Sequence, residues 1–323
     1  HCSVRRQRQM CIRDRDDVYV CHGVTEALQL LFAAVLEEGT KVLAPGPHYP
    51  PYMAYPQMFG AETIEYQLHS DDGWKPDFSD IAEKMDDSVR LLVLINPNNP
   101  CGTVCGADDI DALLEIARRY PNCIVVADEI YDGLDFTGEH VSVASRSEDV
   151  PVVALNGVSK VYYAPGWRIG YMALHDPTNR MGLVRDGLER LLRSRLCAST
   201  PAQVGYLAGL EQDRGWMETY SERVLRRRDH CLKRIAQIDG LEVEQPGGAF
   251  YMFVRLTDER WANDDKAFVL QLLHEEHVLL VHGSGFSPQL GKGHVRLVYL
   301  VTLEVLDEVF DRIERFLKKH RGH

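Results

Sequence analysis

Residues 18–173 alternate short apolar runs, typical of buried strands, with longer runs typical of helices. Lys41–Ala44 precedes the helical run Pro51–Phe59, and Val89–Ile95 precedes Ala107–Arg119. Such alternation predicts βαβ units, in which helices join parallel strands and cover both faces of their sheet. We therefore predict an α/β fold whose large domain has three layers around a mostly parallel sheet.

The sequence after this region predicts a second, smaller domain. Asp213–Ile238 is long, charged and periodic, which indicates a helix that leaves the large domain. Beyond it we expect strands near Leu241–Val243, Phe250–Arg255 and His294–Leu300, and helices near Asp265–Glu275 and Leu303–Lys319. This mixture predicts a large domain over residues 16–225 and a small α+β C-terminal domain over residues 226–323.

The first fifteen residues do not fit either domain. They have no hydrophobic period and are rich in arginine. We interpret residues 1–15 as a non-native tail that resembles the translation of a sequencing adapter. The alternative is a basic arm that binds an anionic partner.

The composition excludes several classes of protein. The chain has 323 residues, of which 45% are hydrophobic, and a net charge of −12. An acidic balance argues against nucleic-acid binding, and no apolar run is long enough for a transmembrane helix. There is also no secretory apolar segment near the start. We expect a cytoplasmic protein with neither nucleic-acid nor membrane partners.

Cysteine and histidine give no sign of a metal site. The eight cysteines form no CxxC pair, and the 13 histidines show no HExxH pattern. Cysteines of this kind are typical of free thiols in a reducing compartment. We predict no metal.

Polar residues follow two of the predicted buried strands. Asn96–Gly102 is a turn directly after Val89–Ile95, and Asp128 comes just after the apolar run Ile124–Val126. Ligands of open α/β sheets bind at the carboxyl ends of the strands. A carboxylate buried there is costly unless a cation pairs with it.

A lysine and an arginine follow the next strand. Lys160 lies just past the run Val152–Leu155, and Arg168 comes eight positions later. A lysine forms an imine with an aldehyde when its amine is neutral, which desolvation or a nearby cation favours. Arg168 is suited to act as that cation and to bind a phosphate. At Gly23–Glu26, small residues open a predicted helix, whose backbone N–H groups suit an anion.

These four segments, in this order, resemble the fold-type I, pyridoxal-phosphate-dependent aminotransferases of class I/II, over residues 16–316. The segments Arg195–Ala198, Gly247–Phe253 and Val278–Val281 make the chain most similar to the bacterial alanine (glutamate–pyruvate) type. The resemblance implies a transferase of the pyridoxal-phosphate-dependent fold and a homodimer. It also implies amino acids and 2-oxo acids as substrates, with alanine/pyruvate and glutamate/2-oxoglutarate as the expected pairs.

The resemblance assigns roles around the cofactor ring of pyridoxal 5′-phosphate. Lys160 would hold the cofactor covalently and later move the substrate proton. Asp128 would pair with the pyridinium nitrogen and keep it protonated. Tyr131 and Asn99 would hydrogen-bond the phenolic oxygen of the ring, and Tyr49 would stack on its face.

The same resemblance assigns the cofactor phosphate to Gly23, Val24, Thr25, Ser159 and Arg168. The chain departs from the family pattern at two positions in these motifs. Cys101 stands where threonine is usual, and Gly157 stands where many relatives have a phosphate-binding serine. These departures concern phosphate binding and leave the proton chemistry untouched.

The substrate would be held by two arginines. The resemblance places Arg296 on the α-carboxylate, next to Asn99. Arg195 is suited to the distal carboxylate of glutamate if it faces the active site across the dimer. An exposed helix arginine is the alternative for Arg195.

Every position also has a purely structural interpretation. These are a helix cap for Asp128, half-buried tyrosines for Tyr49 and Tyr131, a turn residue for Asn99, a surface arginine for Arg296 and a solvated loop lysine for Lys160. Three other functions also fit the scaffold: a carbon–sulfur lyase or decarboxylase, a cofactor-binding regulator, and an inactive fragment of a transaminase. The last follows from a further expectation, that the chain is truncated at its N-terminus relative to the family.

Overall fold

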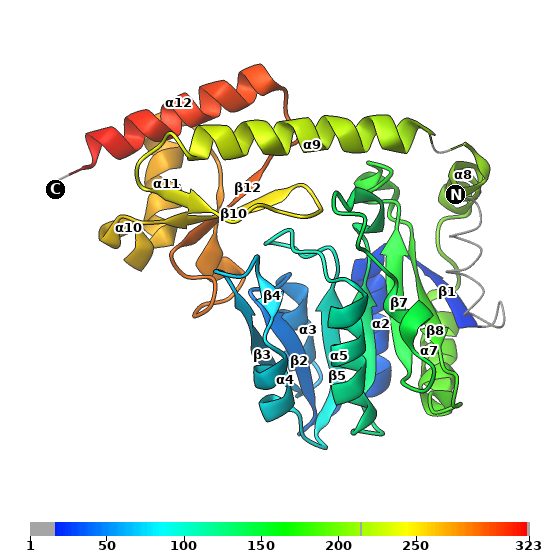
Figure 1. Ribbon diagram of the computed structural model, residues 1–323. Helices are drawn as coiled ribbons and strands as arrows, with labels where there is room; N and C mark the ends of the chain where they lie inside the picture. The colour runs from blue at the N-terminus through cyan, green and yellow to red at the C-terminus, as the bar shows by residue number, and fades with distance from the viewer. Residues whose placement is uncertain (1–16, 214, 322–323) are drawn as a thin grey trace.

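The computed structural model describes residues 17–213 and 215–321. Residues 1–15, for which we predict a non-native tail, lie outside this described part of the chain. The larger part of the molecule is built on an eight-stranded sheet in the order β1-β8-β7-β6-β5-β2-β3-β4 (Figure 1). Its strands are β1 (Val18–Cys21), β2 (Lys41–Gly46), β3 (Glu62–His69), β4 (Lys75–Pro76), β5 (Val89–Ile95), β6 (Ile124–Asp128), β7 (Val152–Gly157) and β8 (Gly170–His175).

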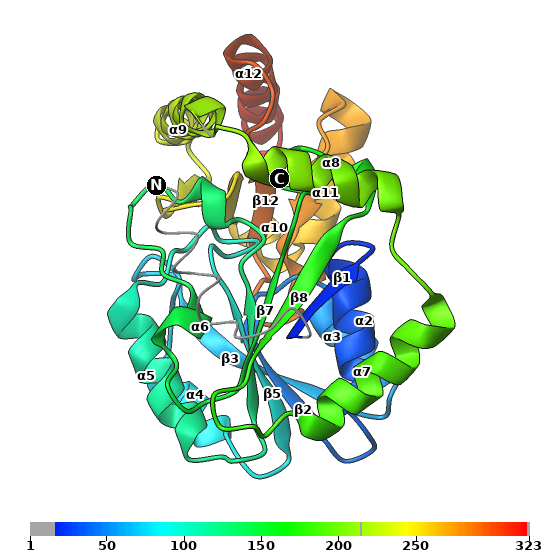
Figure 2. The same cartoon turned by 90° about the vertical axis from the view of Figure 1, so that its right-hand side faces the viewer.

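Helices cover both faces of this sheet, as the alternating pattern predicts. One face packs against α2 (Val24–Val35), α3 (Pro51–Gln57) and α7 (Gly182–Arg195), and the other against α4 (Phe78–Lys84), α5 (Ala107–Arg118) and α6 (Val143–Arg146). Figure 2 shows these two layers on either side of the strands. The residues of β5 alternate between the two cores, with Val93 in the first and Leu92 in the second. A strand buried on both faces is therefore apolar throughout.

The central strands are parallel, and the edges are not. β3, β2, β5, β6 and β7 pair in parallel, whereas β7 with β8, β8 with β1, and β3 with β4 are antiparallel. The strand–helix alternation predicted for residues 18–173 ends at β7. The link from β7 to β8 holds only the short 3-10 helix η3 (Pro165–Trp167), because antiparallel neighbours need no crossover helix.

A four-stranded antiparallel sheet forms the core of the smaller part, in the order β11-β12-β10-β9. Its strands are β9 (Leu241–Val243), β10 (Tyr251–Leu256), β11 (Val281–His282) and β12 (His294–Val298). The helices here are α10 (Glu259–Asn263), α11 (Asp265–Glu276) and α12 (Leu303–Lys319). Leu306, Phe310, Ile313 and Leu317 form the buried stripe of α12, at the spacing of an amphipathic helix.

Two helices connect the parts. α8 (Thr200–Glu211) follows α7, and α9 (Gly215–Ile235) then runs from the large sheet to the small one (Figure 1). α9 spans the domain boundary that we predict at residue 225, so one continuous helix links the two sheets. The small sheet lies near the carboxyl ends of the central strands, where Ile95 of β5, Asp128 of β6 and Leu155 of β7 are in register.

Candidate active site

Most of the predicted site residues line one cavity at the carboxyl ends of β5, β6 and β7. The residues around it are Val24, Thr25, Tyr49, Ile95, Asn99, Asp128, Ile130, Tyr131, Ser159, Lys160, Pro165 and Arg168. They come from five separate segments of sequence. The fold therefore brings together the side chains that the sequence motifs single out.

Asp128 is a buried carboxylate on the floor of this cavity. Its Oδ2 accepts a hydrogen bond from the Tyr52 hydroxyl at 2.9 Å, and Oδ1 accepts a weak one from the Ile130 N–H at 3.4 Å. Burial raises the pKa of Asp128 to about 6, and the Tyr52 bond and the charge of Lys160 oppose that rise. A cation placed against this carboxylate would relieve its desolvation.

Lys160 projects into the same cavity from the turn after β7. Its Nζ lies 5.7 Å from the ring centroid of Tyr131 and 5.8 Å from that of Phe250. Within residues 17–213 and 215–321, the Lys160 Nζ makes no hydrogen bond or ion pair. Its amine is therefore available to a ligand.

Two tyrosines form a buried pair beside Lys160. The hydroxyl groups of Tyr131 and Tyr251 are 2.9 Å apart, and burial raises the pKa of Tyr131 well above its ordinary value. The Tyr131 phenol therefore stays neutral, and it can donate a hydrogen bond. Tyr49, on another wall of the cavity, is half-buried, and burial raises its pKa against the opposing effect of a hydrogen bond to Thr25.

The turn after β5 is fixed by its own asparagines. The Asn96 side chain donates to the Cys105 carbonyl at 3.0 Å and accepts from the Cys105 N–H at 2.9 Å. Asn98 accepts from the Cys101 N–H at 3.1 Å. Asn96 and Asn98 are thus tied to the backbone of the turn. Asn99 instead lines the cavity, where its Oδ1 accepts a hydrogen bond from Arg296 Nη1 at 2.8 Å.

Arg296 reaches this turn from β12 of the small sheet. Its guanidinium carbon lies 4.5 Å from the Tyr251 ring centroid and 4.7 Å from that of Phe286. Its Nε is buried and has no hydrogen-bond partner among the described residues. An arginine that packs against two rings and has an unsatisfied donor is suited to a planar acceptor such as a carboxylate.

The start of α2 and Arg168 form the opposite end of the cavity. Gly23 precedes α2 at φ 79° and gives the helix no side-chain cap, so the first N–H groups stay open to an anion. A Cβ on Gly23 would lie only 2.6 Å from Arg168 Nη2. Arg168 donates to the carbonyls of Pro165 at 2.8 Å and His22 at 3.1 Å, which holds its charge beside this helix.

One of the two departures from the family pattern, Gly157, has a structural explanation. A Cβ on Gly157 would meet the Gly170 Cα and the Ile169 carbonyl oxygen, each at 2.7 Å. Glycine at this position therefore lets β7 and β8 approach closely, and a serine would clash. Cys101 is buried in the turn, and burial raises the pKa of its thiol, which keeps the thiol neutral.

Arg195 is not among the residues that line the cavity. It ends α7, where its Nη2 donates to the Val20 carbonyl at 2.8 Å and its Nε lies 3.5 Å from Glu26 Oε1. Glu26 in turn accepts from the His22 N–H at 2.7 Å. Within the described chain, Arg195 therefore supports the turn between β1 and α2, and contact with substrate across a dimer stays a prediction.

Sequence reasoning missed three residues that shape the site. Tyr52 is fully buried and binds Asp128, Tyr251 binds Tyr131, and Phe286 packs on Arg296. The segment Gly247–Phe253 does contain Tyr251, and Tyr52 lies one turn of helix beyond Tyr49. No local pattern separates these rings from ordinary core residues.

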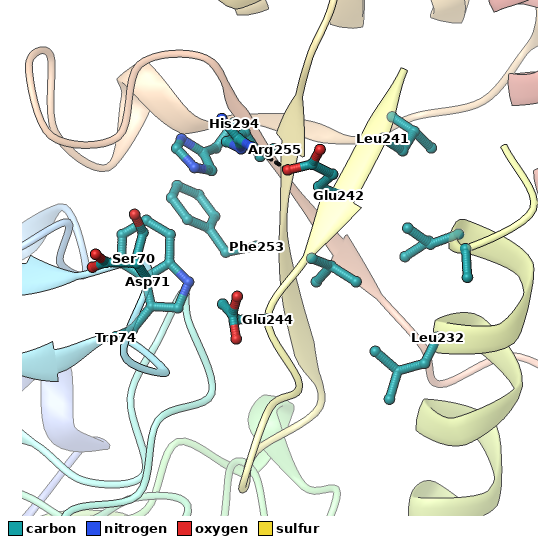
Figure 3. Close-up of a pocket in the computed structure, with 13 residues that line it drawn as sticks. Ser70, Asp71, Trp74, Leu232, Leu241, Glu242, Glu244, Phe253, Arg255 and His294 are labelled. Atoms are coloured by element: carbon teal, nitrogen blue, oxygen red, sulfur yellow. Dashed lines mark hydrogen bonds and ion pairs between the residues drawn. The ribbon is translucent and has the colours of Figure 1, made fainter. Parts of the chain in front are cut away.

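A second, larger cavity lies between the β3–β4 hairpin and the far end of the small sheet (Figure 3). Trp74, Phe253 and His294 form an aromatic wall, and the Phe253 and His294 rings stack at 4.9 Å. Arg255 and Glu242 form an ion pair beside it. None of the predicted site residues lines this second cavity.

Residues 17–213 and 215–321 contain neither a membrane-spanning helix nor a cluster of metal ligands. No helix in these ranges is long and apolar enough to cross a membrane. The same ranges contain no cluster of three or more histidine, cysteine, aspartate or glutamate residues that could hold a metal ion.

Comparison with known proteins points to one family. The family model described as "Aminotransferase class I and II" matches residues 5–313. The glutamate-pyruvate aminotransferase AlaA of Haemophilus influenzae is 35% identical over 314 residues, which cover 95% of this chain and 76% of that protein. The alanine aminotransferase of Mycobacterium tuberculosis is 33% identical over 312 residues, which cover 95% of this chain and 72% of that protein.

Solved structures give the same result. The alanine aminotransferase from Pyrococcus furiosus superposes with a TM-score of 0.94 at 44% identity, covering 98% of this chain and 80% of that one. An aminotransferase from Escherichia coli superposes with a TM-score of 0.93 at 32% identity, with the same coverage.

Proposed function

The chain belongs to the class I and II aminotransferases, and we propose that it is a pyridoxal-phosphate-dependent transaminase that interconverts alanine and pyruvate with 2-oxoglutarate and glutamate. One observation carries the proposal: a free lysine amine, a buried carboxylate and an arginine at a helix start line one cavity. The alanine and glutamate specificity rests on the names of the relatives at 33–44% identity.

The cavity fits pyridoxal 5′-phosphate on three counts. The α2 N-terminus and Arg168 suit a phosphate, because helix N–H groups and a guanidinium both favour anions. Asp128, whose buried charge lacks a full counter-ion, suits a protonated ring nitrogen. Lys160, with a free amine between them, suits the aldehyde.

When bound, the cofactor supplies an aldehyde that links covalently to amines and a protonated ring that withdraws electrons. Asp128 would hold the proton on that ring nitrogen, since its carboxylate is ionised most easily beside a cation. Tyr131 and Asn99 would donate to the ring oxygen, and Tyr49 would cover one face of the ring and exclude water. Lys160 Nζ would take the proton from the substrate α-carbon, and as the resulting ammonium group it would be the proton donor later in the same half-reaction.

Arg296 would orient the substrate for that proton transfer. Its buried Nε and its Nη groups form a flat donor pair, suited to both oxygens of an α-carboxylate. Every amino acid and 2-oxo acid carries this group, so the contact would serve both halves of the reaction. The side-chain preference would have to come from other residues.

We also infer a homodimer. Leu196, Val204 and Leu207, on and beside α7 and α8, are 83%, 62% and 55% exposed. α8 has no buried residue in the single chain. A helix that buries none of its residues and leaves Val204 and Leu207 exposed favours burial against a second copy, and two-fold symmetry is the commonest arrangement of soluble oligomers.

The direct test is a transamination assay on the purified protein with added pyridoxal 5′-phosphate. We expect L-alanine and 2-oxoglutarate to yield pyruvate and glutamate in equal amounts, with the kinetics of two alternating half-reactions. Product formation from an amino acid alone, beyond one equivalent of enzyme and without an oxo acid, would instead indicate a lyase or a decarboxylase. Loss of all product formation in both assays would contradict an active transaminase.

A further inference from the structure

Three connected side chains, of which His48 and Ser287 are fully buried and Glu65 is partly buried, lie directly behind Tyr49. His48 is fully buried, and its Nδ1 lies 3.0 Å from the carbonyl oxygen of Tyr49. Its Nε2 lies 3.2 Å from Glu65 Oε1 on β3, while Glu65 Oε2 accepts from the Ser287 hydroxyl at 2.8 Å. Ser287, also fully buried, accepts from the Leu290 N–H at 3.0 Å.

The acceptor groups around His48 and Ser287 determine which atoms of these two side chains donate hydrogen bonds. The carbonyl of Tyr49 can only accept, so the His48 ring donates from Nδ1. The Ser287 hydroxyl receives the Leu290 N–H, so its own proton points to Glu65. His48 Nε2 and Glu65 Oε1 are buried, and neither has a hydrogen-bond partner of good geometry among the described residues, so the 3.2 Å contact between them is what joins His48 to Glu65.

The same small-sheet segment also contacts the proposed substrate arginine. The carbonyl of Phe286 accepts from the His48 N–H at 3.2 Å, and the ring of Phe286 packs on the Arg296 guanidinium at 4.7 Å. The segment 283–291 is therefore tied on one side to the backbone that carries Tyr49 and on the other to Arg296. These three side chains join the large and small sheets next to the cavity.

We propose that His48, Glu65 and Ser287 are positioning residues that fix Tyr49 and Arg296 relative to each other across the two sheets. The proposal rests on the proposed function for its kinetic consequence, because Tyr49 would cover the cofactor and Arg296 would hold the substrate. Its structural consequence is independent of any ligand: the segments 46–50 and 283–291 should loosen together when the polar contacts of Glu65 with His48 and Ser287 are removed.

Two substitutions at Glu65 separate hydrogen bonding from other effects. Glu65→Gln should keep both contacts of residue 65, because an amide nitrogen can donate to His48 Nε2 and an amide oxygen can accept from Ser287. Glu65→Met has a similar length and offers neither contact. Glu62→Met is the matched control, because Glu62 lies on the same strand, is exposed and makes no ion pair among the described residues.

The first measurement is hydrogen–deuterium exchange on the protein without added cofactor. In Glu65→Met we expect exchange in both segments, 46–50 and 283–291, to rise by at least about tenfold, while Glu65→Gln and Glu62→Met match the wild type. Ser287→Ala, which removes only a hydroxyl, should give the same pattern at smaller amplitude. Exchange in β5 serves as the internal reference for global unfolding.

The second measurement is kinetic. Glu65→Met should lower kcat/KM for L-alanine by roughly tenfold to a hundredfold, since small misplacements of positioning groups have effects of this size. Glu65→Gln should stay within about twofold of the wild type. A wild type without transaminase activity would reject the proposed function and leave the exchange result interpretable.

The proposal is overturned if Glu65→Met exchanges like Glu62→Met in both segments. It is also overturned if Glu65→Gln loosens as much as Glu65→Met, because hydrogen bonding would then not be the cause.

Discussion

At the scale of single residues, the central feature of the cavity is the buried carboxylate of Asp128. Asp128 follows an apolar strand, which is enough to expect a buried carboxylate that needs a cation. Its contact with Tyr52 joins residues 76 positions apart and has no local pattern. The strength of its desolvation is therefore visible only in the folded molecule.

Asp128 gives a prediction on stability against pH in the cofactor-free protein. Burial raises its pKa from 3.8 to about 6, so its contribution to folding is fully present below pH 4 and is lost as the pH rises through about 6. The loss is on the order of 3 kcal/mol at 1.36 kcal/mol per unit. Asp128→Asn has no such loss, because asparagine does not ionise.

Urea unfolding at pH 4 and pH 8 measures this difference. We expect Asp128→Asn to gain stability relative to the wild type at pH 8, compared with pH 4. Free energies of unfolding that change in parallel for the two proteins would contradict a raised pKa at Asp128.

Arg296 gives a prediction on substrate binding. Arg296→Lys should raise KM for every amino acid tested, by about tenfold or more, because lysine lacks the flat pair of donors that matches a carboxylate. Steady-state kinetics with L-alanine and L-glutamate measures it. A KM that stays at the wild-type value for both substrates would place the α-carboxylate site elsewhere.

At the scale of elements, periodicity predicts most helices and strands close to their actual bounds. β5 and α12 begin and end where the sequence indicates, since a continuous apolar run and an amphipathic stripe are strong local signals. The antiparallel return from β7 to β8 was not predictable in this way. It depends on Gly157 facing Gly170 across the pair, a contact between segments that local periodicity does not reveal.

This contact predicts a cost for restoring the family residue. Gly157→Ser should destabilise the protein by roughly 1–3 kcal/mol, because its Cβ would overlap backbone atoms of β8. Gly182→Ala, at the start of α7 with open space around it, is the control and should cost nothing. The free energy of unfolding from denaturant titration measures both, and equal stability of the two variants would contradict the close approach of β7 and β8.

At the scale of the whole molecule, the sequence predicts two parts and a connecting helix. It does not predict how they meet, because the site combines Arg296 of the small sheet with Asn99 of the large sheet, 197 residues apart. Nor does it reveal the cavity of Figure 3, whose walls come from both sheets. Contacts of this range depend on the packing of complete elements.

The exposed surface of α8 gives a prediction on assembly. The double change Val204→Asp and Leu207→Asp should raise the dimer dissociation constant at least about tenfold, because two charges would be buried at the proposed interface. Met58→Asp, at a position that is 71% exposed beyond α3, is the control. Sedimentation velocity measures the association of each variant, and wild-type behaviour of the double variant would exclude α8 from the interface.

The central claim is that Lys160 binds the aldehyde of pyridoxal 5′-phosphate. The most direct measurement is to incubate the protein with the cofactor, reduce the carbon–nitrogen double bond with borohydride and map the labelled peptide by mass spectrometry. We predict one cofactor per chain, on Lys160, with no label at any other lysine and none in Lys160→Ala. A label on another lysine, or no label in the wild type, would contradict this account.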